Sequence, residues 1–286
     1  MGKNIIWAMC SLLAALVLSV MVSCSESSPD FRMMSFNVRY INETIDTGHT
    51  NWEARKGPVL ELLRDKRPDV IGFQEPRKAQ VDFLVSGLPE YGHVELGRDQ
   101  GASPDGGEHL MIMYLTEKYY LADSGSFWMS PTPDVVSRGW DAMCRRVTVW
   151  VRLKEKDTGR ELYFFDTHFD HKGIEARRQE ALLLAARMKE IAGDDVPVFV
   201  CGDFNMDSSH PSMAPIREWM HEACEDAPLT DKGHTYNGFG IDSNPLKIDH
   251  VFYRNATPLT YSVIRDGYGV RYVSDHYPVL AEFDLN

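Results

Sequence analysis

Acidic, amide and imidazole side chains gather where short apolar segments of this sequence end. The clearest case is VPVFVCGDFNMD, residues 196–207, in which a buried-strand pattern stops at a turn that carries Asp203, Asn205 and Asp207. Gly, Asp and Asn all favour turns, so this segment alone fits an ordinary loop. It fits equally well a rigid mount that presents reactive groups at the end of a core strand.

The same arrangement recurs along the chain. Further polar residues that flank apolar segments are Asn37, Glu75, His168, Asp249, His250, Asp275 and His276. Each has an ordinary explanation when taken alone: a turn residue, a solvated strand end or a core histidine with satisfied hydrogen bonds. Turns alone do not explain why acids, amides and imidazoles dominate these positions.

This set of side chains suits metal-assisted attack on a phosphoester. A hard cation such as Mg²⁺ takes oxygen ligands, and proteins usually hold it through one or two carboxylates together with substrate phosphate. We expect Glu75 to serve as such a ligand, with Asn37 and Asp275 nearby.

The remaining residues match the other needs of an in-line displacement. Asp203 is a candidate for orienting and deprotonating the attacking water. Asn205 and His168 are candidate donors to the charge that develops on the phosphoryl oxygens. A carboxylate that holds a histidine fixes its tautomer and raises its basicity, and we expect Asp249 and His276 to form such a pair.

Strands are needed to bring these distant residues together. The patterns predict strands over 31–40, 67–75, 107–115, followed by 119–130, and over 196–200, 247–255 and 274–286, with a hairpin over 145–171. The strongest helical pattern covers 173–193, and another covers 77–88. Because strands outnumber helices and many are joined as hairpins, two stacked sheets with helices outside are expected, rather than a doubly wound parallel sheet.

The N-terminal segment is typical of an export signal. Lys3 precedes the apolar run IIWAMCSLLAALVLSVMV, and the small polar segment SCSESSPD follows. MVSC looks like a bacterial lipobox, which would make residues 1–24 a lipoprotein signal ending at a lipidated Cys24, and 25–30 a short polar tether. An uncleaved membrane anchor is the alternative. Both interpretations place the domain, 31–286, at the cell envelope, facing the periplasm or the exterior.

Composition limits the partners of this domain. The 286-residue chain carries 42 acidic and 30 basic residues, a formal net charge of −12. An acidic surface repels phosphate backbones, so nucleic acid is not favoured as a partner. Only Cys144, Cys201 and Cys224 fall within the domain, and their spacing fits neither a disulfide framework nor a zinc motif.

Six motifs in order resemble those of the endonuclease/exonuclease/phosphatase superfamily: SFNVR, GFQE, DTHFDH, GDFN, KIDHVF and SDHYPV. The likeness spans residues 31–286. The resemblance implies an α+β fold, a four-layer α/β/β/α sandwich of two mixed, mostly antiparallel sheets covered by helices. It also implies hydrolysis of phosphoesters with Mg²⁺ or Mn²⁺ in a cleft at one edge.

The resemblance assigns roles to individual residues. By position in the motifs, the metal residues are Asn37, Glu75 and Asp275, and the catalytic residues are His168, Asp203, Asn205, Asp249 and His276. Glu108 matches a carboxylate that supports the histidine in the deoxyribonuclease branch. Arg39 matches an arginine of that branch and replaces an acidic residue of the apurinic branch.

Further residues are candidates for substrate contact. Arg145 or Arg146 opens a strand, where either would reach a phosphate or lie in solvent, and we include Arg145 in the predicted site. Asp170 and His171 are included as well, with a cap on the helix that starts near Gly173 as the alternative. Aromatic residues in glycine-containing loops would line a pocket or pack the loops: Trp140, Tyr236 and Phe239.

Three functions would use such a site. We expect a phosphodiesterase or phosphatase that acts on a small or head-group substrate at the cell envelope. A secreted or anchored endonuclease is one alternative, although no stripe of basic residues interleaved with aromatics accompanies the motifs. A sphingomyelinase-like phospholipase C is another, and GSFWMSPTP, residues 125–133, would be its apolar hairpin for membrane entry.

Overall fold

The computed structural model describes residues 28–241 and 246–285. Cys24 and the segment interpreted as its signal lie outside the described residues, as does the first half of the proposed tether. Within the described residues, no helix is both long enough and apolar enough to cross a membrane.

Strands make up most of the regular structure in the described residues. They are β1 (Phe31–Asn37), β2 (Val70–Gln74), β3 (Tyr91–Gly97), β4 (His109–Leu115), β5 (Tyr119–Trp128), β6 (Val147–Glu155), β7 (Glu161–His168), β8 (Val198–Asp203), β9 (His221–Glu222), β10 (Leu229–Thr230), β11 (Asp249–Arg254), β12 (Ala256–Val263) and β13 (Val279–Leu285). The helices are α1 (Trp52–Lys66), α2 (Lys78–Gly87), α3 (Ile174–Ala192), α4 (Ala214–Arg217) and α5 (Ala223–Asp226).

Two sheets form the centre of the molecule. The seven-stranded sheet has the order β10-β12-β13-β1-β2-β4-β3, and the six-stranded sheet has the order β5-β6-β7-β8-β11-β9. Most neighbouring strands are antiparallel, and the parallel pairs are β1 with β2, β10 with β12, and β7 with β8. The prediction of two mixed, mostly antiparallel sheets is confirmed.

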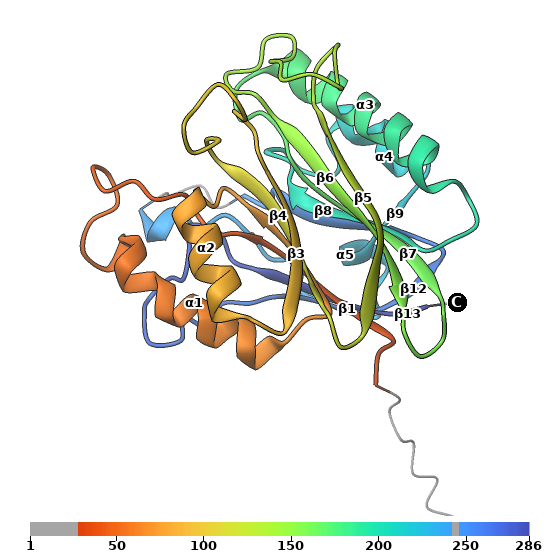
Figure 1. Cartoon of the computed structure of the whole chain (residues 1–286), viewed down its shortest axis with the longest axis horizontal. Coiled ribbons are helices and arrows are strands. Elements are labelled where there is room, and N and C mark those ends of the chain that lie inside the picture. Colours follow the sequence, from red (N-terminus) through yellow and green to blue (C-terminus); the bar gives the residue numbers. More distant parts are fainter. Residues whose placement is uncertain (1–27, 242–245, 286) are drawn as a thin grey trace, which may run out of the picture.

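Three apolar clusters hold the layers together. One lies between the sheets, where the ring centroids of Phe31 and Phe199 are 4.6 Å apart. A second joins α1 and α2 to the seven-stranded sheet, and a third joins α3 and α4 to the six-stranded sheet. Figure 1 shows these two helix pairs on opposite sides of the strands. The four-layer sandwich is therefore confirmed.

The predicted hairpin forms as β6 and β7, which pair antiparallel. The alternating apolar residues of its first strand lie on one face, since Val147, Val149 and Val151 all point into the core between the sheets. The strongest helical pattern forms as α3, whose buried face includes Ala181 and Leu184. Gly193 follows this helix in the left-handed region, at φ 69°.

Several strands differ from the sequence patterns. The strand expected over 196–200 forms as β8 and includes Asp203 as its last residue, and β13 begins only at Val279, after the Asp275–His276 pair. The strands β3 and β12 were not predicted. β3 is a partly exposed edge strand with polar residues, and β12 contains Pro258 at a break in its pairing register.

Strand register brings the predicted site residues to one edge of the sandwich. In the seven-stranded sheet, Asn37 at the end of β1 pairs with Gln74, which directly precedes Glu75. In the six-stranded sheet, Asp203 pairs with His168 on one side and with Asp249 on the other. Backbone pairing therefore fixes which of these residues are neighbours.

Candidate active site

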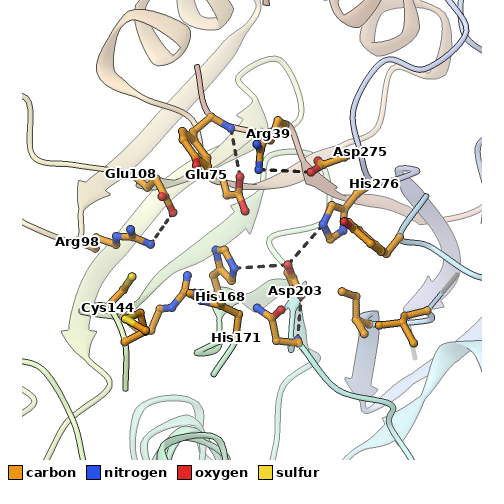
Figure 2. Close-up of a pocket in the computed structure, with 17 residues that line it drawn as sticks. Arg39, Glu75, Arg98, Glu108, Cys144, His168, His171, Asp203, Asp275 and His276 are labelled. Atoms are coloured by element: carbon orange, nitrogen blue, oxygen red, sulfur yellow. Dashed lines mark hydrogen bonds and ion pairs between the residues drawn. The ribbon is translucent and has the colours of Figure 1, made fainter. Parts of the chain in front are cut away.

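A cleft of about 550 Å³ opens at this edge of the sandwich. It is lined by nine of the thirteen predicted site residues, which are Arg39, Glu75, Glu108, His168, His171, Asp203, Asn205, Asp275 and His276. They come from both sheets and from segments more than 230 residues apart, between Arg39 and Asp275. The structure therefore brings most of the predicted site together in one place, as Figure 2 shows.

Asn37 joins the two sheets directly behind the cleft. Its Nδ2 donates to Glu75 Oε1 and to Asp203 Oδ2, each at 3.1 Å. Its Oδ1 accepts the backbone N–H of Arg39 at 3.0 Å. Because Asn37 is only 1% exposed, it holds two carboxylates from different sheets in fixed positions. In this arrangement its amide oxygen faces the backbone rather than the cleft.

Asp249 and His276 form the predicted pair. His276 Nδ1 lies 2.8 Å from Asp249 Oδ2, and its Nε2 lies 3.8 Å from Asp203 Oδ2. Burial by itself would lower the pKa of His276, but the carboxylates of Asp249, Asp203 and Asp275 outweigh it and raise this pKa well above its ordinary value. The imidazole is therefore held as a cation at the wall of the cleft.

His168 has the opposite electrostatic character. Its Nε2 lies 3.4 Å from Asp203 Oδ2. Burial, with the nearby cations Arg146 and Arg98, lowers the pKa of His168 well below its ordinary value. The cleft therefore holds one charged and one neutral imidazole, with Asp203 between them. Neighbouring groups whose pKa values are shifted in opposite directions are typical of sites where one group acts as an acid and another as a base.

Asp203 is suited to accept a proton. Burial raises its pKa to about 7, and the neighbouring charge of Asp249 acts in the same direction. Asn205 donates its backbone N–H to Asp203 Oδ1 at 2.9 Å, and its side-chain Nδ2 donates to the carbonyl of Phe169 at 2.9 Å. Both side chains are therefore oriented by hydrogen bonds before any substrate binds.

Three cleft residues have strained backbones. Arg39, Glu75 and Asn205 are left-handed, with φ values of 58°, 72° and 51°. This conformation is tolerated by Asn but uncommon for Arg and Glu, and strain of this kind costs about 1–3 kcal/mol per residue. All three lie one or two residues after the ends of β1, β2 and β8. The sharp change in chain direction turns their side chains into the cleft.

Glu75 and Glu108 belong to a group of side chains in the cleft that could hold a cation. Ligand atoms of Glu75, Glu108 and His168 lie within 4.8 Å of one another. Burial and the charge of Glu75 together raise the pKa of Glu108 to about 7. Burial and Glu75 also raise the pKa of Asp275. The negative charges of these neighbouring carboxylates repel one another, which makes each harder to ionise. A hard divalent cation bound between them would relieve this repulsion.

Arg39 balances part of this negative charge. Its Nε lies 3.0 Å from Asp46 Oδ2, and its NH1 lies 3.6 Å from Asp275 Oδ2. We use the name acidic side for the part of the cleft formed by Glu75, Asp203, Asp275 and His276. Tyr236 closes this side, since its ring packs edge-on against His276 with centroids 5.0 Å apart.

The opposite wall of the cleft is basic: it contains the predicted His171, Arg146, which was named as the alternative to Arg145, and Arg98, which the sequence patterns did not reveal. We use the name cationic side for Arg98, Arg146 and His171. Arg98 NH1 lies 2.5 Å from Glu108 Oε2, and Arg146 NH2 lies 3.1 Å from His171 Nδ1. Figure 2 shows Arg98 across the cleft from Asp275 and His276.

Arg146 is buried with few acceptors. Its side chain is 4% exposed, and its Nε and NH1 have no hydrogen-bond partner in the described part of the chain. Its nearest carboxylate, Asp170, lies 3.6 Å from Nε. A buried guanidinium with unused donors is costly unless an anion completes it, so this residue suits an incoming phosphate.

In the main cleft, Arg146 and not Arg145 takes the position expected for a phosphate contact. Arg146 lines the main cleft, whereas Arg145 points into an adjoining cavity and forms an ion pair with Asp99 at 2.9 Å. The two residues are adjacent, and their side chains therefore leave the chain in different directions at the start of β6.

Asp170 is likewise corrected from a substrate ligand to a structural residue. Its side chain is fully buried and accepts the backbone N–H groups of Met143, Cys144, Lys172 and Gly173 at 2.7–3.1 Å. Burial alone would raise its pKa, but these four donors lower it to about 2. Asp170 therefore joins the loop before β6 to the start of α3, as the alternative interpretation stated.

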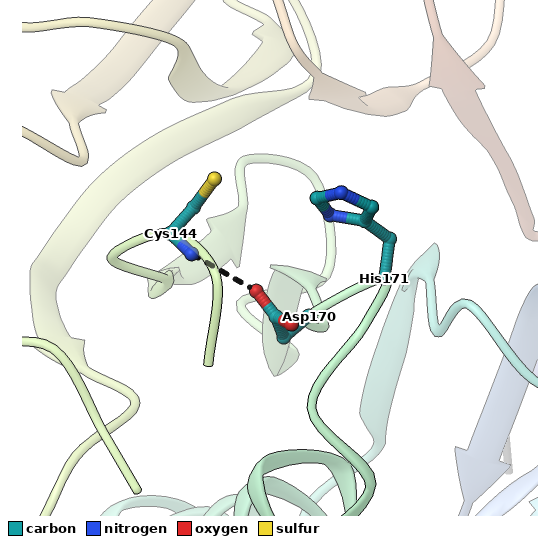
Figure 3. A group of neighbouring side chains, drawn as sticks. All are labelled: Cys144, Asp170 and His171. Atoms are coloured by element: carbon teal, nitrogen blue, oxygen red, sulfur yellow. Dashed lines mark hydrogen bonds between the residues drawn. The ribbon is translucent and has the colours of Figure 1, made fainter. Parts of the chain in front are cut away.

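Cys144, Asp170 and His171 form another group with ligand atoms within 4.8 Å, drawn in Figure 3. Both oxygens of Asp170 already accept backbone N–H groups, and His171 Nδ1 already contacts Arg146. Only the thiol of Cys144 and the second ring nitrogen of His171 remain, so this group lacks the donors of a metal site.

The aromatic loop residues and the expected membrane hairpin also have clear positions. Tyr236 lines the cleft, Phe239 lines a neighbouring hollow, and Trp140 lines neither. The apolar part of GSFWMSPTP is not exposed, because Phe127 and Met129 are fully buried and Trp128 is 8% exposed. The expectation that this segment offers an apolar surface for membrane entry is therefore wrong.

Comparisons with known proteins agree with this geometry. The model of the Endonuclease/Exonuclease/phosphatase family matches residues 34–276. A solved endonuclease/exonuclease/phosphatase from Bacteroides vulgatus is 35% identical, with a TM-score of 0.83 over 90% of this chain and 99% of the other. A solved mannosyl-6-phosphatase from Bacteroides thetaiotaomicron is 33% identical, with a TM-score of 0.82 over 88% and 99%.

A viral relative extends the comparison. A protein of Acanthamoeba polyphaga mimivirus is 29% identical over 254 residues, which cover 82% of this chain and 92% of that protein. The matched range 34–276 begins within β1 and ends at His276, so it includes the whole cleft described above. The chain belongs to the Endonuclease/Exonuclease/phosphatase family.

Proposed function

We propose that this protein is a divalent-metal-dependent phosphoesterase that removes phosphate from a small organic phosphate. The observation that carries the proposal is the arrangement around Asp203. Its Oδ2 lies 3.1 Å from Asn37 Nδ2, 3.4 Å from His168 Nε2 and 3.8 Å from His276 Nε2, while Asp249 holds His276 from behind. This is a proton acceptor held by one hydrogen bond, with two imidazoles and clustered carboxylates beside it.

Each residue then has a defined task. A divalent cation held by Glu75 and Glu108, in the cleft that Asp275 also lines, would draw charge from the phosphoryl oxygens. Asp203 takes the proton of the attacking water, because it is raised in pKa and lines the cleft. His276, kept cationic by Asp249, donates to an oxygen that becomes negative during bond cleavage.

The cationic side supports binding of the phosphate itself. Arg146 brings unused donors to the cleft wall, and Arg98 and His171 lie beside it. Planar guanidinium groups match the paired oxygens of a phosphate. A phosphate located between the acidic and cationic sides would contact Arg146 on one face and meet the water held by Asp203 on the other.

A small substrate is favoured over a polymer. The cleft volume of about 550 Å³ is within the range of small-molecule sites. The chain has a net charge of −12, which opposes long polyanions. The structurally similar mannosyl-6-phosphatase, at 33% identity, makes a phosphorylated sugar the first substrate class to examine.

We also propose that Cys24 anchors the protein to a membrane at the cell envelope. β1 starts at Phe31, next to the tether, and ends at Asn37 behind the cleft. Seven strand residues span roughly 20 Å, so the cleft lies about that far from the start of β1, where a tether from Cys24 would join the domain. Because Phe127, Trp128 and Met129 are buried rather than exposed for membrane entry, this orientation favours a substrate from the surrounding solution over a lipid head group. Labelling of the wild type but not of Cys24→Ala with a fatty-acid probe would support the anchor, and equal labelling would oppose it.

A panel of substrates tests the proposed reaction. Purified protein is incubated with Mg²⁺ and p-nitrophenyl phosphate, bis-p-nitrophenyl phosphate, mannose 6-phosphate, an oligonucleotide or sphingomyelin vesicles. We expect the monoesters to give the highest kcat/KM, and Asp203→Asn to lower turnover of every hydrolysed compound by about 10³-fold. Preferred cleavage of the oligonucleotide or of sphingomyelin would replace this proposal with the nuclease or the phospholipase.

A further inference from the structure

A second cavity adjoins the cleft on its cationic side. It has a volume of about 660 Å³ and shares Arg98, Met143 and Cys144 with the cleft. Its other lining residues are Asp99, Arg138 and Arg145. The shared residues mean that a molecule bound in the cleft could extend into this cavity without crossing a layer of the protein.

The cavity carries an excess of positive charge. Three arginines line it, and Asp99 is the one acidic residue among its lining residues. Arg145 NH1 lies 2.9 Å from Asp99 Oδ1, and Arg98 Nε lies 3.9 Å from Asp99 Oδ2. This local excess is notable in a chain with a net charge of −12. A concave surface of one charge sign concentrates ligands of the opposite sign.

The arginines of this cavity have unused donors. Each guanidinium carries five N–H donors. Arg138 is exposed and makes no hydrogen bond or ion pair with any part of the chain that the structure describes. Arg145 makes a single hydrogen bond, to Asp99, within the same described residues. The protein therefore supplies fewer acceptors than these side chains can use.

We propose that Arg98, Arg138 and Arg145 form an arginine subsite that binds a second anionic group on the leaving-group part of the substrate. This inference rests on the proposed function and names the substrate class. The substrate is an organic phosphate that also carries a carboxylate or a second phosphate. Guanidinium groups bind both anions through paired hydrogen bonds, which explains why arginine rather than lysine lines the cavity.

Arg98 connects the two parts of the site. On the cleft side its NH1 contacts Glu108 at 2.5 Å, and on the cavity side its Nε faces Asp99 at 3.9 Å. A substrate with two anionic groups would place the scissile phosphate between the acidic and cationic sides and the second group beyond Arg98. Selection would then depend on the leaving group and not on the phosphate that is removed.

Steady-state kinetics with matched sugar phosphates tests this inference. The expected result is that kcat/KM for fructose 1,6-bisphosphate and 6-phosphogluconate exceeds kcat/KM for glucose 6-phosphate by about tenfold or more, a factor that corresponds to one good charged contact. In Arg138→Gln and Arg145→Gln this ratio should fall severalfold. Arg178→Gln, an exposed arginine on α3, is the matched control and should keep the wild-type ratio.

Two outcomes would overturn the subsite while leaving the proposed function in place. One is hydrolysis of all three sugar phosphates with equal kcat/KM. The other is a preference for the charged compounds that persists unchanged in both variants. A preference for an oligonucleotide over the bisphosphate would also reject it, because neighbouring phosphates of a polymer would then be the anions that the arginines bind.

A binding measurement separates this inference from the reaction itself. Wild type and Arg138→Gln are titrated by calorimetry with fructose 1,6-bisphosphate and with fructose 6-phosphate in the presence of EDTA. The subsite predicts about tenfold tighter binding of the bisphosphate to the wild type, and loss of this difference in the variant. Equal binding of both sugars to the wild type rejects the subsite, whether or not the protein hydrolyses any phosphoester.

Discussion

The acidic and cationic sides of the cleft are built from different kinds of structure. On the acidic side, Glu75 and Asp203 sit at the ends of paired strands, and Asn37 hydrogen-bonds to both. On the cationic side, Arg98 follows the edge strand β3, and Arg146 directly precedes β6 after the long loop from 129 to 146. The first set is fixed by sheet register, and the second depends on how loops fold over the sheet edge.

This difference separates the residues that carry out the reaction from the residues that select the substrate. Groups that transfer protons must be held closely in position, which strand pairing and buried hydrogen bonds provide. Groups that choose the substrate can be carried by loops, which tolerate sequence change while the scaffold stays intact. We therefore expect substitutions on the acidic side to lower kcat and substitutions on the cationic side to act mainly through KM.

The largest effect is expected from Asp203→Asn. This change keeps the shape and most hydrogen bonds of the side chain but removes the proton acceptor, so kcat should fall by about 10³-fold, as for other general bases. The melting temperature should stay within a few degrees of the wild type. Asp207→Asn, in the exposed loop four residues on, is the matched control and should keep full activity. A kcat for Asp203→Asn close to wild type would contradict its assigned role.

A smaller effect, seen mainly in KM, is expected from Arg146→Gln. Loss of a buried guanidinium that meets the phosphate should raise KM for p-nitrophenyl phosphate by roughly 10–100-fold, the cost of a charge-assisted contact. Arg146→Lys retains the charge but not the paired donors, and its KM should lie between the two. A fall in kcat with KM unchanged would instead place this residue with the acidic side.

Glu75→Gln should act on the metal requirement. Glu75 is the carboxylate shared by the Asn37 contact and the Glu108–His168 group, so its loss should raise the Mg²⁺ concentration for half-maximal rate by about tenfold or more. Glu95→Gln is the matched control, because Glu95 lies on β3 and outside the cleft. An unchanged Mg²⁺ requirement in Glu75→Gln would remove this residue from the metal set.

The last expected effect is on stability rather than on activity, and it arises beneath the cationic side. Glu180 is fully buried, and its Oε2 accepts the backbone N–H of Asp170. Burial raises its pKa to about 8, so the folded protein binds a proton that the unfolded chain releases above its ordinary value of 4.5. Stability should therefore fall as pH rises between these values, by at most about 5 kcal/mol.

Glu180→Gln removes this pH dependence because Gln stays neutral. Its melting temperature should match the wild type near pH 5 and exceed it by several degrees near pH 9. Glu190→Gln, at an exposed position on the same helix, should show no such gain. A wild type whose advantage over Glu180→Gln grows with pH would contradict the assigned protonation state.

The sequence was sufficient to predict the acidic side because its residues are adjacent to strands with clear apolar patterns. GFQE, GDFN and KIDHVF each place polar groups at one end of a buried strand, and strands of two stacked sheets end at shared edges. The pairing of Asp249 with His276 followed from the same reasoning, and the structure places their side chains 2.8 Å apart.

The cationic side could not be predicted in the same way. Arg98 follows β3, whose polar, half-exposed sequence gives no strand signal. Arg145 and Arg146 are adjacent, and their side chains point in different directions. The local sequence pattern does not show which of the two points into the cleft. The role of Asp170 depends on backbone groups at 143 and 144, which the tertiary fold brings to it from 26 or more residues away.

The central claim is that the acidic side binds a divalent cation needed for phosphoester hydrolysis. The most direct measurement is the rate of p-nitrophenyl phosphate hydrolysis by protein stripped with EDTA and then titrated with Mg²⁺. We predict no measurable turnover in EDTA and a saturable recovery as Mg²⁺ exceeds the chelator. Full activity in excess EDTA would contradict the account, because the clustered carboxylates would then have no cation to serve.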